Sequence, residues 1–190
     1  TEAVVDVDVP AAPSATMNNN KVVVVGDTHG QLQDYLFILR HHGLPSRTNV
    51  YMVNGDIADR GAYAVEIFLT LALFKLSDPA CVHVNRGNHE DAALSRAYDF
   101  EAELVAKYGA ATTLLDDADD AFCAMPLGCV VNHGSTRTMV LHGHLPRSLP
   151  SLEELKRAPR VRSVVAESEE DVEVVRDILW SDPWDQSDVV

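Results

Sequence analysis

The amino-acid sequence predicts an α/β fold built around a parallel sheet. Three short runs rich in β-branched residues, at 21–27, 49–56 and 81–88, each end in glycine together with aspartate or asparagine. Their starts lie about 30 residues apart, the length of a βαβ unit, and the intervals show helical periodicity. Parallel strands place their carboxyl ends along one edge of a sheet, so we expect the three polar ends to meet.

The remaining elements follow from apolar spacing. Apolar residues recur at i, i+3, i+4 and i+7 from Leu32 to Leu39 and from Val65 to Ala72, which predicts two crossover helices. Further elements are expected in this order: a helix over 94–108, another over 115–125, a hairpin of 127–132 with 137–143 that starts a second sheet, a helix opened by a capping box of Ser151 and Glu154, and a last helix over 170–180.

The composition excludes several classes of protein. A length of 190 residues fits one domain, and the formal charge of −14 argues against nucleic acid or an anionic membrane as a partner. A phosphate-bearing substrate would need local compensation by a metal ion or arginine. No apolar run approaches the ~18 residues of a membrane span. The three cysteines, Cys81, Cys123 and Cys129, are interpreted as buried free thiols of a reducing compartment.

The two ends of the chain carry expectations of their own. Residues 1–16 are acidic and rich in alanine and proline, without the basic start and apolar core of a signal peptide. We therefore expect residues 1–20 to form a disordered lead-in to one domain over 21–190. The chain starts at Thr1 and stops just after a Trp-Ser-Asp-Pro segment, so we expect a processed product or part of a longer protein.

The sequence Gly-Asp-Thr-His-Gly at 26–30 carries the first polar cluster. Asp27 and His29 lie two residues apart, so an extended backbone directs both side chains to the same side. A carboxylate with an imidazole suits Zn, Fe or Mn better than Mg or Ca. The alternative is a helix entry in which Asp27 or Thr28 serves as the cap.

The second cluster follows the second strand, at 54–61. Asp56 at the strand end suits a second metal ligand or a bridge between two ions, which in phosphoester hydrolysis lie ~3.5–4 Å apart. Arg60 offers a bidentate fork for phosphate oxygens. The alternative is that Asp59 and Arg60 form an ordinary surface ion pair.

The third cluster follows the third strand, in the sequence Val-Asn-Arg-Gly-Asn-His-Glu. Asn88 can ligate a metal through its carbonyl oxygen, while His89 serves as proton donor to a leaving alkoxide. Asp59 is a natural carboxylate to orient that imidazole. Glu90 is expected to cap the following helix or to pair with Arg86.

A histidine from the second sheet completes the set. His142 lies at the end of the strand 137–143 and suits the shell of a second metal ion. His133 and His144 also flank glycines, and His142 is favoured by its strand-end position together with the family resemblance described below. Four such clusters, three of them at βα spacing, predict one shared site for paired cations.

At these residues the chain closely resembles the phosphoprotein phosphatase family of metal-dependent serine/threonine phosphatases. Gly-Asp-Thr-His-Gly, Gly-Asp-Ile-Ala-Asp-Arg-Gly and Arg-Gly-Asn-His-Glu are similar to the three signature blocks of that family, in order and at matching intervals. The later segments 141–160 and 177–183 also resemble it, so the similarity extends from about residue 21 to 186. The first block is most similar to branches that carry tetratricopeptide or EF-hand regulatory domains.

The resemblance implies a four-layer α/β/β/α metallophosphoesterase sandwich of two mixed sheets. It implies two metal ions, Mn, Fe or Zn, with these ligands: Asp27, His29 and Asp56 on one ion, and Asp56, Asn88 and His142 on the other. His89, supported by Asp59, would protonate the leaving group, and Arg60 and Asn88 would contact the phosphate. A metal-bridging hydroxide would attack phosphorus directly, without a phosphoenzyme.

The resemblance also implies partners and a location. Substrates would be proteins that carry phosphoserine or phosphothreonine, and a regulatory subunit or regulatory domain would control the enzyme. The location would be intracellular, in the cytoplasm, the nucleus or both.

Three departures from the family pattern matter. Ile57 and Ala58 stand where the family usually has an aromatic residue and valine, a tolerable packing change. His144 replaces a glycine and adds bulk beside the second metal. The family also continues past residue 186 with another metal histidine, a second phosphate-binding arginine and much of the second sheet. We therefore expect a catalytic domain truncated at its C-terminal end, with an incomplete second sheet and weak activity.

Two other functions fit the sequence. The truncation and His144 favour a non-catalytic phosphatase-like scaffold or phospho-reader subunit, whereas retention of the early ligands and of His89 opposes it. A dinucleoside polyphosphate hydrolase of the same superfamily would share the first blocks. Glu90 and the Leu-Trp-Ser-Asp-Pro segment fit the protein phosphatases better.

Overall fold

Two three-stranded sheets form the centre of the protein. The computed structural model describes residues 2–9, 20–110 and 112–182. The first sheet has the order β2 (Lys21–Val25), β3 (Asn49–Val53), β4 (Val82–Val84), and all its pairs are parallel. The second sheet has the order β1 (Val4–Val9), β5 (Gly128–His133), β6 (Thr136–Leu141), with a parallel and an antiparallel pair. The predicted α/β class is confirmed.

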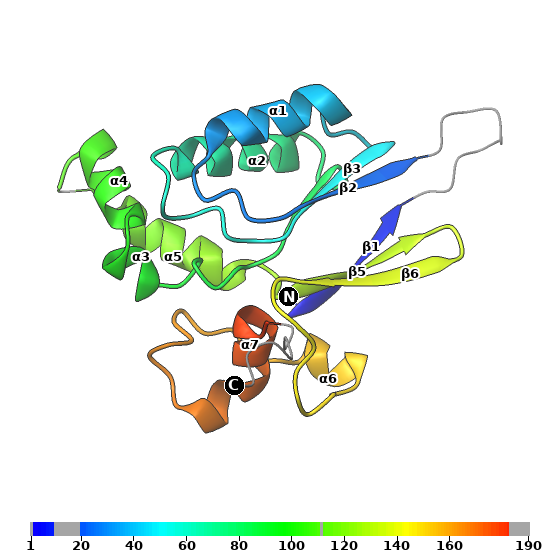
Figure 1. Ribbon diagram of the computed structural model, residues 1–190. Helices are drawn as coiled ribbons and strands as arrows, with labels where there is room; N and C mark the ends of the chain where they lie inside the picture. The colour runs from blue at the N-terminus through cyan, green and yellow to red at the C-terminus, as the bar shows by residue number, and fades with distance from the viewer. Residues whose placement is uncertain (1, 10–19, 111, 183–190) are drawn as a thin grey trace, which may run out of the picture.

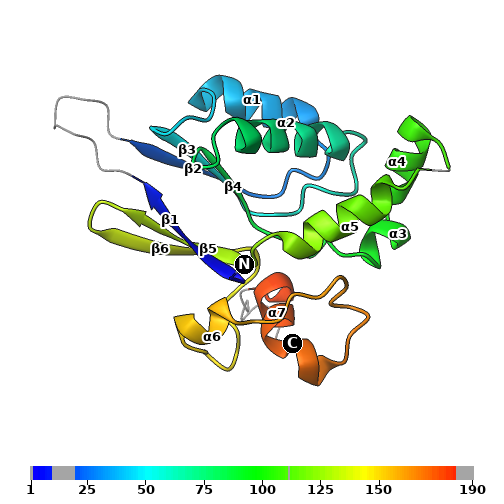
Figure 2. The same ribbon diagram turned by 180° about the vertical axis from the view of Figure 1, so that it is seen from behind.

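Helices cover the outer faces of both sheets, which gives the four expected layers in partial form. Helices α1 (Leu32–His42) and α2 (Ala64–Ser77) cover the first sheet, whereas α6 (Leu152–Lys156) and α7 (Glu169–Trp180) lie beyond the second sheet (Figures 1 and 2). Helices α3 (Leu94–Ala97), α4 (Phe100–Tyr108) and α5 (Leu114–Ala124) lie at one end of the sandwich. Among the helices in the described residues, none is long and apolar enough to cross a membrane.

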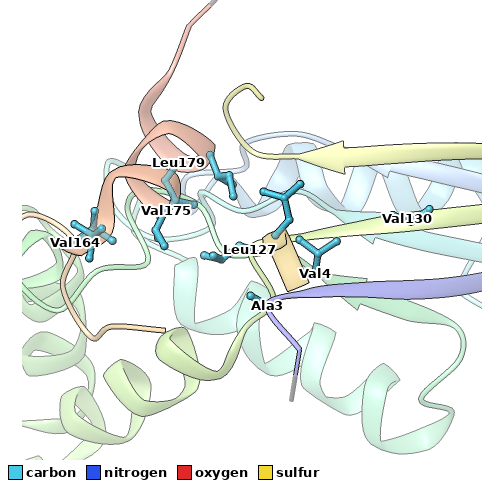
Figure 3. Close-up of a cluster of buried hydrophobic side chains, with 10 residues drawn as sticks. Ala3, Val4, Leu127, Val130, Val164, Val175 and Leu179 are labelled. Carbon is cyan, nitrogen blue, oxygen red and sulfur yellow. The ribbon is translucent and has the colours of Figure 1, made fainter. Parts of the chain in front are cut away.

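The central strand β3 shows how alternation builds the layers. Tyr51 and Val53 pack into the cluster under α1 and α2, while Val50 and Met52 pack into the cluster between the two sheets. All five residues of this strand are buried because both faces of the sheet are covered. A third cluster, which includes Val4, fills the space between the second sheet and α7 (Figure 3).

The N-terminal segment differs from its prediction. Residues 1–20 were expected to be disordered, but Val4–Val9 form the strand β1, which pairs with β5 from Val4↔Gly128 to Val9↔His133. Val7 and Val9 are buried between the sheets, whereas Asp6 and Asp8 are exposed, so this stretch has the alternation of a half-buried strand. The residues 10–19 of the expected lead-in lie outside the described residues.

One predicted helix is two helices in the structure. The expected helix over 94–108 is interrupted between α3 and α4, at Tyr98 and Asp99. The carboxylate of Asp59 accepts hydrogen bonds from the backbone N–H groups of Asp99 and Phe100, and these bonds fix the start of α4. Apolar spacing alone could not reveal this contact. The three cysteines are free as predicted; Cys81 and Cys129 are buried, whereas Cys123 was expected to be buried and is only half-buried.

Candidate metal centre

The four polar clusters meet at one edge of the sandwich. The loop after β2 is bound to the loop after β3, because the backbone N–H groups of Thr28 and His29 both donate to the carbonyl oxygen of Asp56, at 3.0 and 2.9 Å. The loop after β4 reaches the same point, since the N–H of His89 donates to Asp56 Oδ1 at 3.0 Å. His142, at the end of β6, contributes the fourth side chain, with Nε2 3.4 Å from Asp56 Oδ1.

Two histidines are each held through Nδ1, so that Nε2 faces Asp56. Nδ1 of His29 donates to the carbonyl oxygen of Ala58, and Nδ1 of His142 donates to that of Asn54, each at 2.7 Å. A carbonyl only accepts, so the proton lies on Nδ1 and the lone pair on Nε2. Both Nε2 atoms lie 3.4 Å from Asp56, on different carboxylate oxygens. Metal-ligating histidines are oriented in this way.

The donor set fits a pair of cations. The Nε2 atom of His29 is buried and has no hydrogen-bond partner. Potential ligand atoms form two groups, each within 4.8 Å, and both contain Asp56. The groups are His29, Asp56 and His89, and Asp27, Asp56 and His142. This grouping sets Asp27 with His142, whereas the resemblance implied Asp27 with His29, so which ion Asp27 contacts stays a prediction.

Asn88 lies between these groups. In the orientation of its amide that satisfies the hydrogen bonds, the nitrogen donates to His142 Nε2 at 2.9 Å and to the two carboxylate oxygens of Asp56 at 3.1 and 3.2 Å. Rotation of the amide by half a turn presents its carbonyl oxygen at the same place. The side chain would therefore be within reach of a cation held by His142 and Asp56.

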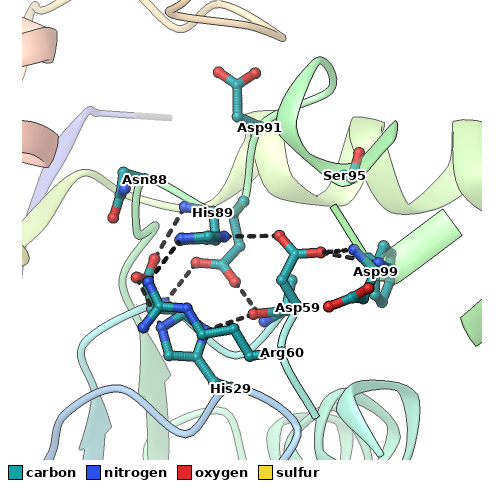
Figure 4. Close-up of polar contacts among 12 residues, drawn as sticks. His29, Asp59, Arg60, Asn88, His89, Asp91, Ser95 and Asp99 are labelled. Atoms are coloured by element: carbon teal, nitrogen blue, oxygen red, sulfur yellow. Dashed lines mark hydrogen bonds and ion pairs between the residues drawn. The ribbon is translucent and has the colours of Figure 1, made fainter. Parts of the chain in front are cut away.

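His89 is held between a carboxylate and a guanidinium (Figure 4). Its Nδ1 donates to Asp59 Oδ2 at 2.7 Å, and its Nε2 lies 3.4 Å from Nη2 of Arg60. The hydrogen bond to Asp59 raises the pKa of His89 above its ordinary value; burial opposes this rise, and the charge of Asp56 adds to it. The bond to Asp59 fixes the orientation of the imidazole, with Nε2 directed toward Arg60.

Backbone strain is concentrated at this site. Among the non-glycine residues in the described ranges, those with positive φ are His29, Asp56, Asp59, Arg60 and Leu149, so four of the five belong to the site. Such conformations cost about 1–3 kcal/mol each and persist only where surrounding contacts impose them. They support a functional role for these loops.

Two expectations about neighbouring residues need correction. Glu90 does not cap the following helix, because its carboxylate accepts backbone N–H bonds from Asp56, Ile57, Ala58 and Gly87. Its contact with Arg86 runs through the main-chain carbonyl oxygen and not through the carboxylate. Burial raises the pKa of Glu90 and the charge of Asp56 adds to this, whereas the backbone N–H donors oppose it. The two oxygens of this carboxylate thus join the loops after β3 and β4.

The departures from the family pattern have different outcomes. Ile57 and Ala58 are fully buried, each within a hydrophobic cluster, so both contribute to the core. His144 is exposed and belongs to neither ligand group in the described part of the chain.

Sequence reasoning missed Tyr98 as a site residue. Its ring packs edge-on against His89, with centroids 5.1 Å apart, and its side chain is about half exposed. Tyr98 reaches this place because the chain breaks between α3 and α4, and no sequence pattern signals that break.

Fold and site together define a protein of the α/β sandwich class, with candidate metal ligands on loops at one edge of the sheets. The profile of the calcineurin-like phosphoesterase family matches residues 20–189, and the chain belongs to that family.

Named relatives agree with the resemblance to phosphoprotein phosphatases. The chain is 39% identical over 168 residues to serine/threonine-protein phosphatase 5 of Homo sapiens. The aligned residues make up 88% of this chain and 32% of the relative. It is 35% identical over 182 residues to serine/threonine-protein phosphatase rdgC of Drosophila melanogaster. That match covers 90% of this chain and 27% of the relative. The chain thus spans about a third of the length of the curated relatives it matches.

A solved structure supports the fold. The structure of a protein serine/threonine phosphatase from Saccharomyces cerevisiae with similarity to human phosphatase PP5 superposes with a TM-score of 0.77 at 28% identity. The match covers 96% of this chain and 54% of the yeast chain. The expected metallophosphoesterase fold is confirmed.

Proposed function

We propose that this chain provides the metal-ligating and proton-donating part of a serine/threonine protein phosphatase. The proposed reaction is hydrolysis of phosphoserine and phosphothreonine in proteins, with two ions of Mn, Fe or Zn. The observation that carries the proposal is the pair of histidine Nε2 atoms, from His29 and His142, which lie against opposite oxygens of Asp56. Family membership and the named relatives support it.

The proposed metal ligands are Asp27, His29, Asp56, Asn88 and His142. Carboxylate and imidazole donors suit Mn, Fe and Zn. Such ions, when bound, supply Lewis-acid polarisation of the phosphate and lower the pKa of a water molecule. His29, at 8% exposed, and Asp56, at 3%, are both buried, so their ligand atoms lie away from bulk solvent.

The proposed roles of the remaining residues concern the leaving group and the phosphate. A serine alkoxide is a poor leaving group unless an acid protonates it, and His89 is proposed to supply that proton from Nε2. Asp59 holds the imidazole in the tautomer and orientation that this transfer requires, through the 2.7 Å bond to Nδ1. Arg60 lies next to Nε2 and is proposed to bind phosphate oxygens.

Metal content and turnover test the proposal together. The chain, loaded with Mn²⁺, is assayed with a phosphoserine peptide and with a dinucleoside tetraphosphate, for wild type and His89→Ala. His144→Ala is the matched control, since His144 is exposed and outside both ligand groups. We expect peptide hydrolysis that depends on His89 and not on His144.

Each other outcome selects a different function. Metal binding without turnover that depends on His89 supports the scaffold or phospho-reader and refutes the phosphatase. Preference for the dinucleotide supports the hydrolase of that substrate class. The regulatory partner and the intracellular location stay predictions from the sequence.

A further inference from the structure

Glu90 is a buried carboxylate whose hydrogen-bonding capacity is filled by the backbone. The residue is 0% exposed. Its Oε2 accepts from the N–H groups of Asp56 at 2.7 Å and Gly87 at 2.8 Å, and its Oε1 accepts from those of Ile57 at 2.9 Å and Ala58 at 3.1 Å. A carboxylate has about four acceptor positions, so none is left for a cation. Glu90 therefore lies beside the candidate metal centre without being a ligand.

The four donors lie on the two loops after β3 and β4, which carry Asp56 and Asn88, two of the five proposed ligands. These loops cross so closely that a Cβ at Gly55 would lie 2.3 Å from the nitrogen of Gly87, and a Cβ at Gly87 would lie 2.3 Å from the nitrogen of Asp56. Both glycines are required for this approach. The Glu90 carboxylate accepts hydrogen bonds from both loops where they cross. One of these bonds comes from the N–H of Asp56, whose φ is 51°.

Glu90 is also anchored at its main chain. Nε of Arg86 donates to the carbonyl oxygen of Glu90 at 2.7 Å. The guanidinium is 1% exposed and donates further to the carbonyl oxygens of Val161 at 2.6 Å and Arg162 at 3.0 Å. These contacts fix the backbone of Glu90 against a distant segment, so its carboxylate has little freedom to move away from the two loops.

We infer that Glu90 is a positioning residue that sets Asp56 relative to Asn88 and His89, and thereby the spacing of the two cations. This inference rests on the proposed function, because it concerns the same site. The carboxylate of Asp56 faces His29 on one oxygen and His142 on the other, so a small shift of its backbone would alter both ligand groups at once. Groups that orient metal ligands change metal affinity by about 10–100-fold when they are replaced.

The test uses Mn²⁺ as the probe, with the variants Glu90→Gln and Glu103→Gln. Glutamine keeps the volume of Glu90, but one oxygen becomes an NH₂ group, so two of the four N–H bonds are lost whichever way the amide is oriented. Glu103 is a matched control: it is also buried, and its carboxylate accepts from the N–H groups of Ala64 and Val65 at the start of α2, away from both ligand groups.

Calorimetric titration and electron paramagnetic resonance give the readouts, and both are independent of turnover. For Glu90→Gln we expect Mn²⁺ affinity to fall by about 10–100-fold, and the signal of two exchange-coupled Mn²⁺ ions to be replaced by that of isolated ions. For Glu103→Gln we expect a lower unfolding temperature with wild-type Mn²⁺ affinity and a wild-type coupled signal.

The outcomes separate this role from the proposed function. A folded Glu90→Gln protein with wild-type affinity and a wild-type coupled signal overturns the inference alone. Failure of the wild-type chain to bind two Mn²⁺ ions refutes the proposed function and the inference together. Should Glu90→Gln not fold, Glu90→Asp takes its place, because it keeps the charge but is too short to reach all four donors. If neither variant folds while Glu103→Gln does, the role is purely structural and the inference is wrong.

Discussion

Replacement of Asp59 by asparagine isolates one hydrogen bond of the proposed proton donor. Oδ1 of Asp59 accepts from the N–H groups of Asp99 at 3.1 Å and Phe100 at 2.8 Å, and Oδ2 accepts from Nδ1 of His89 at 2.7 Å. The asparagine carbonyl can keep both bonds to the start of α4, so its NH₂ group faces His89. The variant therefore loses the bond to the imidazole while the start of the helix stays in place.

The magnitude follows from the strength of that bond. A hydrogen bond to a charged group contributes about 1.5–3 kcal/mol. At about 1.36 kcal/mol for each tenfold change in rate, Asp59→Asn is expected to lower kcat/KM by about 10–150-fold where protonation of the leaving group limits the reaction. The direction is a loss, because the neutral amide no longer stabilises the protonated imidazole or fixes its tautomer.

The dependence on leaving group provides the assay. A phosphoserine peptide releases an alkoxide that needs a proton, whereas p-nitrophenyl phosphate releases a stable oxyanion. We expect the large loss on the peptide and a much smaller one on p-nitrophenyl phosphate. Asp99→Asn, which alters an exposed carboxylate next to the site, is the control and should leave both rates near wild type. Equal losses on the two substrates, or a further loss in a His89→Ala background, would refute the proposed proton transfer.

Three further predictions concern stability. Mn²⁺ at one hundred times its Kd should raise the free energy of unfolding by about 2.7 kcal/mol, measured by thermal denaturation. The Asp56→Asn variant should lose this stabilisation by Mn²⁺. An undiminished stabilisation in the variant would contradict the role of Asp56 as a metal ligand. Gly87→Ala should lower the free energy of unfolding, measured by urea denaturation, by about 1–3 kcal/mol, because the new Cβ would lie 2.3 Å from the nitrogen of Asp56. Wild-type stability of this variant would show that the loops after β3 and β4 can separate to make room. Burial, with the charge of Lys75 as a smaller cause, lowers the pKa of His83 to about 4, below the ordinary value of 6.5. As the pH falls, His83 therefore binds a proton in the unfolded chain before it does so in the folded protein, and the free energy of unfolding should decline from pH 6.5 toward 4. The decline should be less steep in His83→Gln. Equal declines in the wild type and the variant would contradict the lowered pKa of His83.

The sequence predicted those features that depend on local pattern. The three strands of the first sheet, the helices α1 and α2 and the hairpin of β5 and β6 follow from apolar spacing, and the meeting of Asp27, Asp56 and Asn88 follows from the geometry of parallel strands. These patterns lie within single segments or repeat at one fixed interval.

The features that the sequence did not predict depend on contacts between distant residues. The alanine and proline content of 1–16 obscured the alternation of Val4–Val9, and only pairing with β5 makes that segment a strand. The start of α4 depends on the carboxylate of Asp59, and the place of Glu90 depends on the crossing of two loops. Neither contact has a signature in the spacing of residues along the chain.

The strand β1 has a consequence for how the protein folds. Val4 pairs with Gly128 and Val9 with His133, so the two halves of this parallel ladder are separated by the whole of the first sheet and its helices. Pairing across such a long loop carries a large closure entropy and raises the contact order. During synthesis β1 must wait, with its valines unpaired, until β5 has left the ribosome, and a chaperone that shields short apolar strands would act most usefully in that interval.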